Sequence, residues 1–276
     1  ASGICHSQLH QMHRPRPQPV ILGHESTGVV LKTGSAVSHV QEGDTVLVTW
    51  VPRDAGAANA PPVTAQLEVS DGIAISENVF TWADHTICDQ QYVVKVDPNI
   101  KKDVTAIIGC AVMTGAGAVI NTAKVKAGQS VVIFGVGGVG LSAVVGAKVA
   151  GANPIIAVDL DDRKLSFAKT FGATHVINAS EVDPVTAIHE MTTQSDQFTI
   201  LKSPVSGADY AFDCIGIRST MEQIVPACRS GHFGAAPGGT AVLVGVPSTE
   251  VTLNAIDVLL NEKQFIGSIG GSCAPD

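Results

Sequence analysis

Two cysteines and one histidine in this 276-residue chain have neighbours that suit a catalytic metal site. Cys5 lies in a polar stretch, Cys110 follows a glycine, and His24 is followed by Glu25. Two thiolates and one imidazole are three of the four ligands of a tetrahedral zinc ion, so one position stays open. An open position lets zinc polarise an alcohol or carbonyl oxygen. Because a single cysteine in an apolar run is usually a small core residue, the prediction rests on all three together.

A glycine-rich turn follows the apolar run at residues 131–134 and precedes a stretch with helical character. The turn runs from residue 135 to 140, and its candidate coenzyme-binding residues are Gly135, Gly137, Gly138, Val139 and Gly140. Asp159 ends the next apolar run, about 20 residues further on, which is the spacing of a dinucleotide-binding motif. Gly137 would let the backbone approach the pyrophosphate, and the start of the helix would bind the phosphates. Asp159 would accept both adenosine ribose hydroxyls and repel a 2′-phosphate, which favours NAD over NADP.

From Gly3 to about Gly271 the chain resembles zinc-dependent alcohol dehydrogenases of the medium-chain dehydrogenase/reductase family, because these motifs occur in the family's order. The resemblance implies an α/β protein with two domains. Residues 1–114 would form a GroES-like, β-rich catalytic domain that lacks its first strands. Residues 115–276 would form a Rossmann NAD-binding domain without the usual return to the catalytic domain. Strands alternating with helices after residue 130 also predict a doubly wound parallel sheet.

The resemblance assigns roles to residues beside the three expected zinc ligands. Ser7 would contact the substrate hydroxyl, and His10 would be the terminal base of a proton relay, unless it is a plain surface imidazole. Glu25 would lie beside the metal as a neighbour or exchange ligand. Gln8 stands where the family commonly has Asp, so zinc affinity could be lower than usual.

Further positions match residues that bind the coenzyme in the family. These positions are His6, Thr114, Lys164, Val244 and Val246. His6 would face the pyrophosphate, and Thr114 would pack on the nicotinamide ring beside the backbone of the two valines. Lys164 would be a second ribose contact, although it could equally be a solvated surface lysine.

The stretch between Trp50 and Val69 contains no cysteine, whereas many members of the family carry a structural zinc lobe of four cysteines there. A structural zinc site is closed by four ligands. We therefore expect one catalytic zinc and no structural zinc.

Composition limits the partners and the compartment. The net charge is −8 without a Lys/Arg cluster, which argues against nucleic acid. No apolar run of about 18 residues is found, so we expect no membrane span. The six cysteines lack the spacing of a disulfide framework, which favours reduced thiols in the cytoplasm. The family implies a homodimer or homotetramer.

The leading hypothesis is hydride transfer between a small-molecule alcohol or aldehyde and NAD(H). One alternative is a dehydrogenase for the thiol adduct (S-hydroxymethyl) of formaldehyde, which residues 11–19 support little because they contain no acidic side chain. Another is an inactive relative that binds NAD without turnover. Quinone reductases without zinc would lack the Cys5, His24 and Cys110 set.

Overall fold

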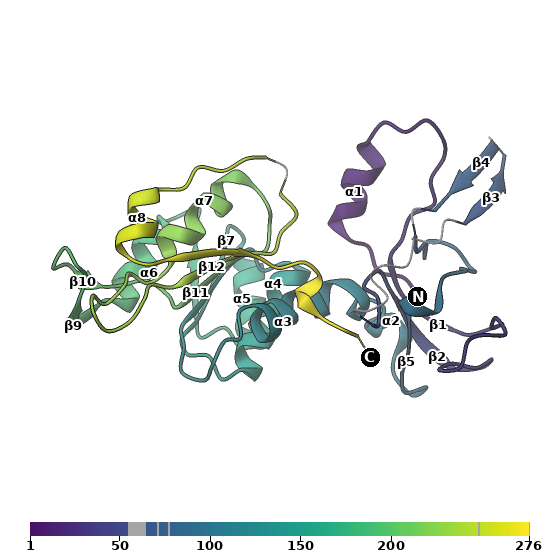
Figure 1. Ribbon diagram of the computed structural model, residues 1–276, viewed down its shortest axis with the longest axis horizontal. Helices are drawn as coiled ribbons and strands as arrows, with labels where there is room; N and C mark the ends of the chain where they lie inside the picture. Colours follow the sequence, from purple (N-terminus) through teal and green to yellow (C-terminus); the bar gives the residue numbers. More distant parts are fainter. Residues whose placement is uncertain (55–64, 71, 77, 248, 276) are drawn as a thin grey trace. The chain divides into compact units, whose positions relative to one another are not determined.

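The computed structural model describes residues 1–54, 65–70, 72–76, 78–247 and 249–275 (Figure 1). The chain divides into two compact units. The first unit consists of Ala1–Val112 with Cys273–Asp276, and the second consists of Met113–Ser272. The domain boundary expected after residue 114 stays a prediction.

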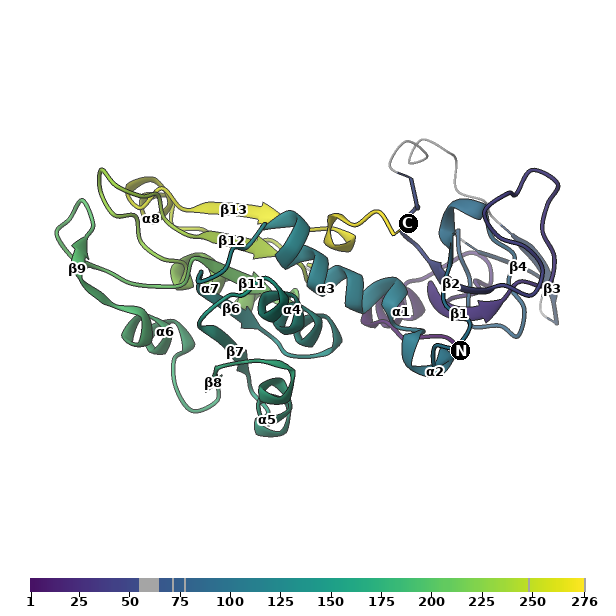
Figure 2. The same ribbon diagram turned by 90° about the horizontal axis from the view of Figure 1, so that it is seen from below.

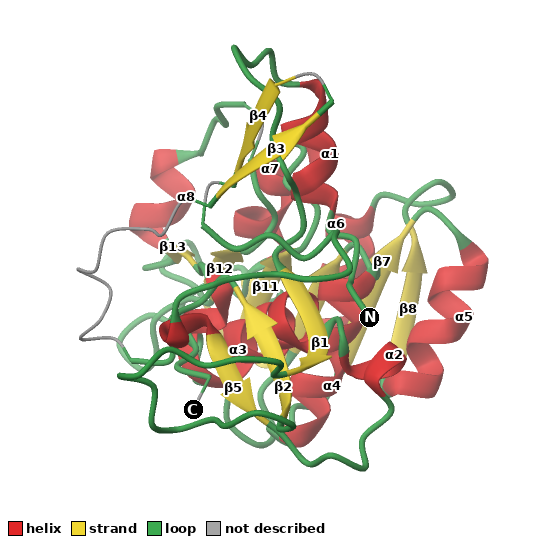
Figure 3. Ribbon diagram, turned by 90° about the vertical axis from the view of Figure 1, so that its right-hand side faces the viewer, coloured by secondary structure: helices red, strands yellow, loops and turns green. Residues whose placement is uncertain are grey.

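A three-stranded antiparallel sheet forms the base of the first unit (Figure 3). Its strands, in spatial order, are β1 (Glu25–Val29), β2 (Thr45–Thr49) and β5 (Val93–Lys95). The central strand β2 is buried along its whole length, and its β-branched residues suit that position. Its Val46 packs with Val40 and Val93 in a small core. The sheet positions the segments next to it, which include the residues just before β1.

Short elements surround this sheet. They are the helices α1 (His6–His13) and α2 (Lys102–Thr105), the hairpin of β3 (Gln66–Val69) and β4 (Gly72–Ile75), a 3₁₀ turn (Gln90–Tyr92) and a π-helical turn (Ile108–Val112). Helix α1 begins after Cys5, whose backbone N–H donates to Oε1 of Gln8 at 3.1 Å. This hydrogen bond satisfies one of the backbone N–H groups that have no acceptor within the helix at its start.

The second unit contains a parallel six-stranded sheet with the order β13-β12-β11-β6-β7-β8 (Figure 2). Its strands are β6 (Val131–Phe134), β7 (Ile155–Asp159), β8 (His175–Asn178), β11 (Tyr210–Asp213), β12 (Thr240–Leu243) and β13 (Gln264–Gly267). This spatial order is that of a dinucleotide-binding fold. The direction in which successive strands are added reverses between β6 and β11, which is the switch point of the sheet. The predicted doubly wound parallel sheet is confirmed.

Helices cover both faces of this sheet. They are α3 (Met113–Gly117), α4 (Gly138–Val149), α5 (Asp162–Phe171), α6 (Pro184–Thr192), α7 (Arg218–Ala227) and α8 (Ala255–Leu260), with a π-helical turn (Ala118–Thr122) and a 3₁₀ turn (Gly270–Ser272). Val144 of α4 and Leu165 of α5 belong to one apolar cluster, whereas Ile188 of α6 and Ile224 of α7 belong to the other. The buried, apolar strands between them are typical of a parallel sheet. A separate hairpin consists of β9 (Gln194–Phe198) and β10 (Pro204–Val205).

The helical stretch Lys102–Thr122 is long and apolar enough to cross a membrane by length and composition alone. This finding corrects the expectation that no run of such length is apolar enough. Core helices pass the same test, and Ala118 and Val119 of this stretch are fully buried in the core of the second unit. The finding is therefore weak evidence for a membrane span.

Candidate functional site

Cys5, His24 and Cys110 come together in the first unit, with one ligand atom of each lying within 4.8 Å of the others. Each comes from a different element: Cys5 precedes α1, His24 precedes β1, and Cys110 lies in the π-helical turn Ile108–Val112. The two sulfur atoms are 3.9 Å apart. In a tetrahedral zinc site with Zn–S bonds of about 2.3 Å, two sulfurs are separated by about 3.8 Å. The three residues therefore have the spacing of ligands around one ion.

Two glycines fix the backbone beside two of these residues. Gly23, next to His24, has φ +98°, and a Cβ there would collide with the backbone of Trp82. Gly109, next to Cys110, approaches β2 so closely that a Cβ would lie 2.8 Å from the carbonyl oxygen of Val48. The same turn is held to β2 by Thr49, whose hydroxyl donates to the carbonyl of Gly109 at 2.6 Å. Glycine at these positions therefore places the imidazole and the thiol.

Gly109→Ala is expected to lower stability by about 1–3 kcal/mol and to reduce bound zinc, because the added methyl group pushes the turn that carries Cys110 away from β2. Thermal unfolding and metal analysis of the purified variant measure both effects. Gly28→Ala is the matched control, since a Cβ at Gly28 meets no described atom within 4 Å. Full zinc content and an unchanged Tm in Gly109→Ala would show that the close approach is not required.

Buried polar atoms without partners indicate that this group fits a metal. Nε2 of His24 and Oε2 of Glu25 are buried and make no hydrogen bond of ordinary geometry with the described residues. Leaving such atoms unpaired costs free energy, so buried polar groups in folded proteins normally have a partner. One imidazole nitrogen and two sulfurs are a donor set that zinc prefers. A zinc ion bound to Nε2 of His24 would satisfy this buried nitrogen, which makes no hydrogen bond of ordinary geometry within the part of the chain that the structure describes.

The electrostatics of the group favour a thiolate at Cys5. Contact with Cys110, and also with His24 and Ser7, lowers the pKa of the Cys5 thiol to about 3. The pKa of Cys110 is raised, because its thiol donates to the Cys5 sulfur and is buried. Burial also raises the pKa of Glu25 to about 7. Cys5 is therefore held in the form that binds metal ions.

The other residues that the sequence assigned to the first unit lie on α1. The hydroxyl of Ser7 donates to the sulfur of Cys5 at 3.3 Å. His6 and His10 lie one helical turn apart, with ring centroids 5.3 Å from each other. Gln8 is buried, and its contact is with the Cys5 backbone. Ser7 is thus beside the candidate metal ligands, whereas the proton relay to His10 and the coenzyme contact of His6 stay predictions.

Trp50 is a part of this site that the sequence did not predict. Its indole Nε1 is buried and makes no hydrogen bond of ordinary geometry with the described residues. The indole lies close enough to Cys110 to lower the pKa of that thiol, against the larger effects that raise it. Its position directly after the buried strand β2 was the signal available in the sequence.

The glycine turn of the second unit lies at the carboxyl end of β6 and leads into α4. Gly135 has φ +83°, and a Cβ there would collide with the side chain of Ile215. A Cβ at Gly140 would collide with the backbone of Gly135, so glycine is required for this packing. Gly137 directly precedes the helix, which starts with Gly138 and Val139. Amide groups at such a helix start are a general phosphate-binding arrangement.

Asp159 lies beside this turn at the carboxyl end of β7. Its Oδ2 accepts a hydrogen bond from the backbone N–H of Val136 at 3.0 Å, and its Oδ1 accepts one from Leu160 at 2.8 Å. Nζ of Lys164 lies 3.8 Å from the same Oδ1. The structure therefore brings together the turn, the acid and the lysine that the sequence singled out.

The remaining predicted coenzyme residues of the second unit are Thr114, Val244 and Val246. Oγ1 of Thr114 in α3 is buried and has no hydrogen-bond partner among the described residues. Val244 follows β12, and its N–H donates to the carbonyl of Asp213 at 3.0 Å. Val246 is largely exposed, so its side chain is accessible to a ligand. Their roles toward a coenzyme stay predictions.

A buried carboxylate that the sequence analysis missed organises the loop after β11. Asp213 is fully buried and accepts hydrogen bonds from the N–H of Gly216 at 2.9 Å and from the hydroxyl of Thr220 at 2.7 Å. Burial raises the pKa of this carboxyl group. The loop carries Ile215, which packs over Gly135 of the glycine turn. Asp213 thereby helps to shape the carboxyl edge of the sheet at its switch point.

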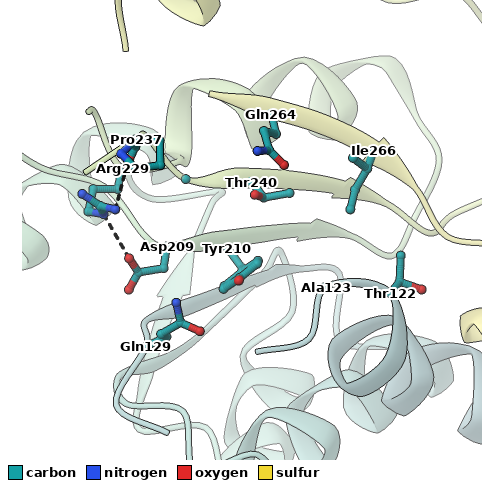
Figure 4. Close-up of a pocket in the computed structure, with 12 residues that line it drawn as sticks. Thr122, Ala123, Gln129, Asp209, Tyr210, Arg229, Pro237, Thr240, Gln264 and Ile266 are labelled. Atoms are coloured by element: carbon teal, nitrogen blue, oxygen red, sulfur yellow. Dashed lines mark hydrogen bonds and ion pairs between the residues drawn. The ribbon is translucent and has the colours of Figure 1, made fainter. Parts of the chain in front are cut away.

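A pocket of about 430 Å³ in the second unit lies at the other end of the strands (Figure 4). Its lining includes Tyr210, Thr240 and Gln264, which begin β11, β12 and β13. On one side, Nε of Arg229 lies 3.0 Å from Oδ1 of Asp209. Ligands of doubly wound sheets bind at the carboxyl ends of the strands, so this pocket is distinct from the expected nucleotide site.

Comparison with known proteins agrees with this geometry. Residues 1–98 match the family described as alcohol dehydrogenase GroES-like domain, and residues 138–276 match the family described as zinc-binding dehydrogenase. The chain is 35% identical over 272 residues to alcohol dehydrogenase class-3 of Cereibacter sphaeroides, covering 88% of this chain and 71% of that protein. It is 34% identical over 274 residues to S-(hydroxymethyl)glutathione dehydrogenase of Paracoccus denitrificans, with the same coverage of 88% and 71%.

Among solved structures, benzyl alcohol dehydrogenase from Acinetobacter calcoaceticus superposes with a TM-score of 0.83 at 31% identity. The match covers 99% of this chain and 76% of that one. Fold and sequence together define a dehydrogenase with a GroES-like and a Rossmann domain. The chain belongs to the zinc-dependent alcohol dehydrogenases of the medium-chain dehydrogenase/reductase family, as its resemblance predicted, and it is an oxidoreductase.

Proposed function

We propose that this protein transfers a hydride between a small-molecule alcohol or aldehyde and NAD(H), and that Cys5, His24 and Cys110 hold one catalytic zinc. The observation that carries the proposal is the convergence of these three residues within 4.8 Å, with Nε2 of His24 buried and making no hydrogen bond of ordinary geometry with the described residues. When bound, zinc supplies Lewis-acid polarisation of the substrate oxygen, and the nicotinamide supplies hydride exchange. NADH formation with a panel of alcohols tests the proposal.

An alcohol must lose its hydroxyl proton when it is oxidised, and side chains of this protein would accept that proton. The Ser7 hydroxyl lies 3.3 Å from the Cys5 sulfur, so it would accept the proton of an alcohol bound there while it passes its own proton on toward His10. His10, one turn after His6 on α1, would be the terminal base of this relay and would release a proton to water. The buried Glu25 is the next residue after His24, and its carboxyl group would influence the charge of that imidazole as a neighbour of the metal ligands.

The second unit would hold the coenzyme. The pyrophosphate would bind at the turn of Gly135 to Gly140, where backbone N–H groups at the start of α4 are available. Asp159 and Lys164 would bind the adenosine ribose, and the charge of Asp159 would disfavour a 2′-phosphate. Thr114, Val244 and Val246 would adjoin the nicotinamide ring, and His6 would contact the pyrophosphate.

The protein is expected to bind one zinc per subunit. The described residues contain one group of three or more His, Cys and acidic side chains with metal-ligand spacing. The stretch at 51–69 has no cysteine, although its residues 55–64 lie outside the described residues. Metal analysis of the purified protein measures the ratio. Two tightly held zinc ions per subunit would contradict the expectation of no structural zinc.

A second candidate substrate is the S-hydroxymethyl adduct of a thiol with formaldehyde. It is favoured by the name of the 34%-identical relative from Paracoccus denitrificans. Residues 11–19 provide His13, Arg14 and Arg16 but no acidic group to bind the amine of a glutathione adduct. Comparing kcat/KM for S-hydroxymethylglutathione with that for benzyl alcohol separates the two substrates. An inactive relative would bind NADH yet oxidise neither.

We also infer a cytoplasmic homodimer or homotetramer without nucleic acid or a membrane as partner. No disulfide joins the described cysteines, which suits a reducing compartment. Light scattering of the purified protein distinguishes two or four copies of the chain from one.

A further inference from the structure

The loop after β7 carries an ion pair next to the acid that is proposed to select NAD. Asp161 directly precedes α5, and its Oδ1 accepts the backbone N–H of Arg163 at 2.9 Å. The guanidinium of Arg163 folds back on the same carboxylate, with Nε 3.1 Å from Oδ1 and Nη2 2.8 Å from Oδ2. Both carboxylate oxygens are therefore engaged by one arginine in a two-point arrangement.

This arginine is the kind of side chain that an NADP site needs. A guanidinium binds phosphate through two parallel hydrogen bonds, and arginine is the usual partner of the 2′-phosphate in dinucleotide-binding folds. Arg163 lies four positions after Asp159, whose carboxylate marks the expected place of the adenosine ribose. A sequence with Arg at this position therefore contains an element that could favour NADP.

Asp161 works against binding of a 2′-phosphate by Arg163 in two ways. It binds the guanidinium, and it adds a negative charge close to Asp159, whose Oδ1 accepts the Asp161 N–H at 3.2 Å. Because Asp161 also caps α5, its side chain is fixed in place rather than free to turn away. The contact with Arg163 keeps the pKa of Asp161 low, at about 2, so the charge persists at every physiological pH.

We propose that Asp161 is a second determinant of coenzyme choice, which holds the Arg163 guanidinium where it cannot bind a 2′-phosphate; the proposal rests on the proposed NAD site. The competing explanation is that the pair is an exposed contact without consequence. The side chain of Arg163 is 92% exposed, and exposed ion pairs are often weak. A 2′-phosphate would then recruit Arg163 whether or not Asp161 is present.

The test measures the Kd of NADPH by fluorescence titration in variants that start from Asp159→Gly, which opens space for the phosphate. Adding Asp161→Asn keeps a capping acceptor for α5 but removes the charge and the two-point pair. We expect this change to tighten NADPH binding about tenfold, since a charge-assisted bond to phosphate becomes available. A third substitution, Arg163→Ala, is expected to abolish the gain, while the Kd of NADH changes by less than about twofold between these variants.

Asp162→Asn in the same Asp159→Gly background is the matched control. It removes an equal charge one residue away, and Asp162 contacts Asn178 rather than Arg163 in the structure. An equal tightening of NADPH in the Asp161 and Asp162 variants, or a gain that survives Arg163→Ala, would overturn the proposal. So would an unchanged Kd in Asp161→Asn. Failure of the NAD site itself would appear differently, as an Asp159→Gly variant whose NADH to NADPH ratio equals that of the wild type.

Discussion

Cys110→Ser is expected to lower NADH formation by about 1,000-fold or more and to leave the protein largely without zinc. Zinc contributes several kcal/mol to the stabilisation of negative charge on the substrate oxygen, and about 1.4 kcal/mol corresponds to a factor of ten. Serine removes the sulfur that lies 3.9 Å from Cys5, and its hydroxyl is a poor ligand at neutral pH. Zinc content and kcat/KM are measured on the same preparation.

The variant should keep its affinity for NADH, because the glycine turn and Asp159 belong to the second unit. Cys88→Ser is the matched control: Cys88 is a half-buried cysteine of the first unit that packs against the small core of Val40, Val46 and Val93. It should retain zinc and turnover. Near-normal turnover in Cys110→Ser would remove Cys110 from the metal site, and loss of NADH binding would indicate unfolding instead.

Asp159→Gly is expected to erase most of a wild-type preference for NAD of roughly 30- to 1,000-fold in kcat/KM. The preference corresponds to about 2–4 kcal/mol, since hydrogen bonds to a charged group contribute about 1.5–3 kcal/mol and two like charges add repulsion. NAD would become weaker and NADP would become acceptable. The acidic Asp161 and Asp162 remain, so the variant should not become strongly selective for NADP.

The ratio of kcat/KM for the two coenzymes is the quantity to measure. Asp159 also accepts the backbone N–H groups of Val136 and Leu160, so its loss loosens the glycine turn for both coenzymes alike. The ratio cancels that common loss and isolates the effect on the ribose. A wild type that uses NADP as well as NAD, or a ratio that the substitution does not move, would contradict the role of Asp159.

Local sequence pattern was sufficient to predict the parallel sheet of the second unit and its glycine turn. The apolar runs became β6 and β7, and the glycine turn became the start of α4, because such runs and turns have strict local requirements. The helix begins at Gly138, inside the glycine turn, although glycine has a low helix propensity.

Features that depend on contacts distant in sequence were not predictable. The hairpin strand β9, with the sequence QSDQF, has no alternation of apolar and polar residues. Asp213 and Trp50 matter through burial and through neighbours far along the chain, which no local window shows. The meeting of Cys5 with Cys110 was expected from family motifs and not from spacing, because 105 positions separate them.

Zinc titration of metal-depleted protein tests the central claim most directly. Zinc is removed with a chelator and added back in known amounts, and NADH formation from an alcohol is followed at each zinc to subunit ratio. We expect activity to be lost on depletion, to rise in proportion to added zinc and to saturate at about one zinc per subunit, whereas Cys110→Ser gives no such rise. Full NADH formation by the zinc-free protein would contradict the account.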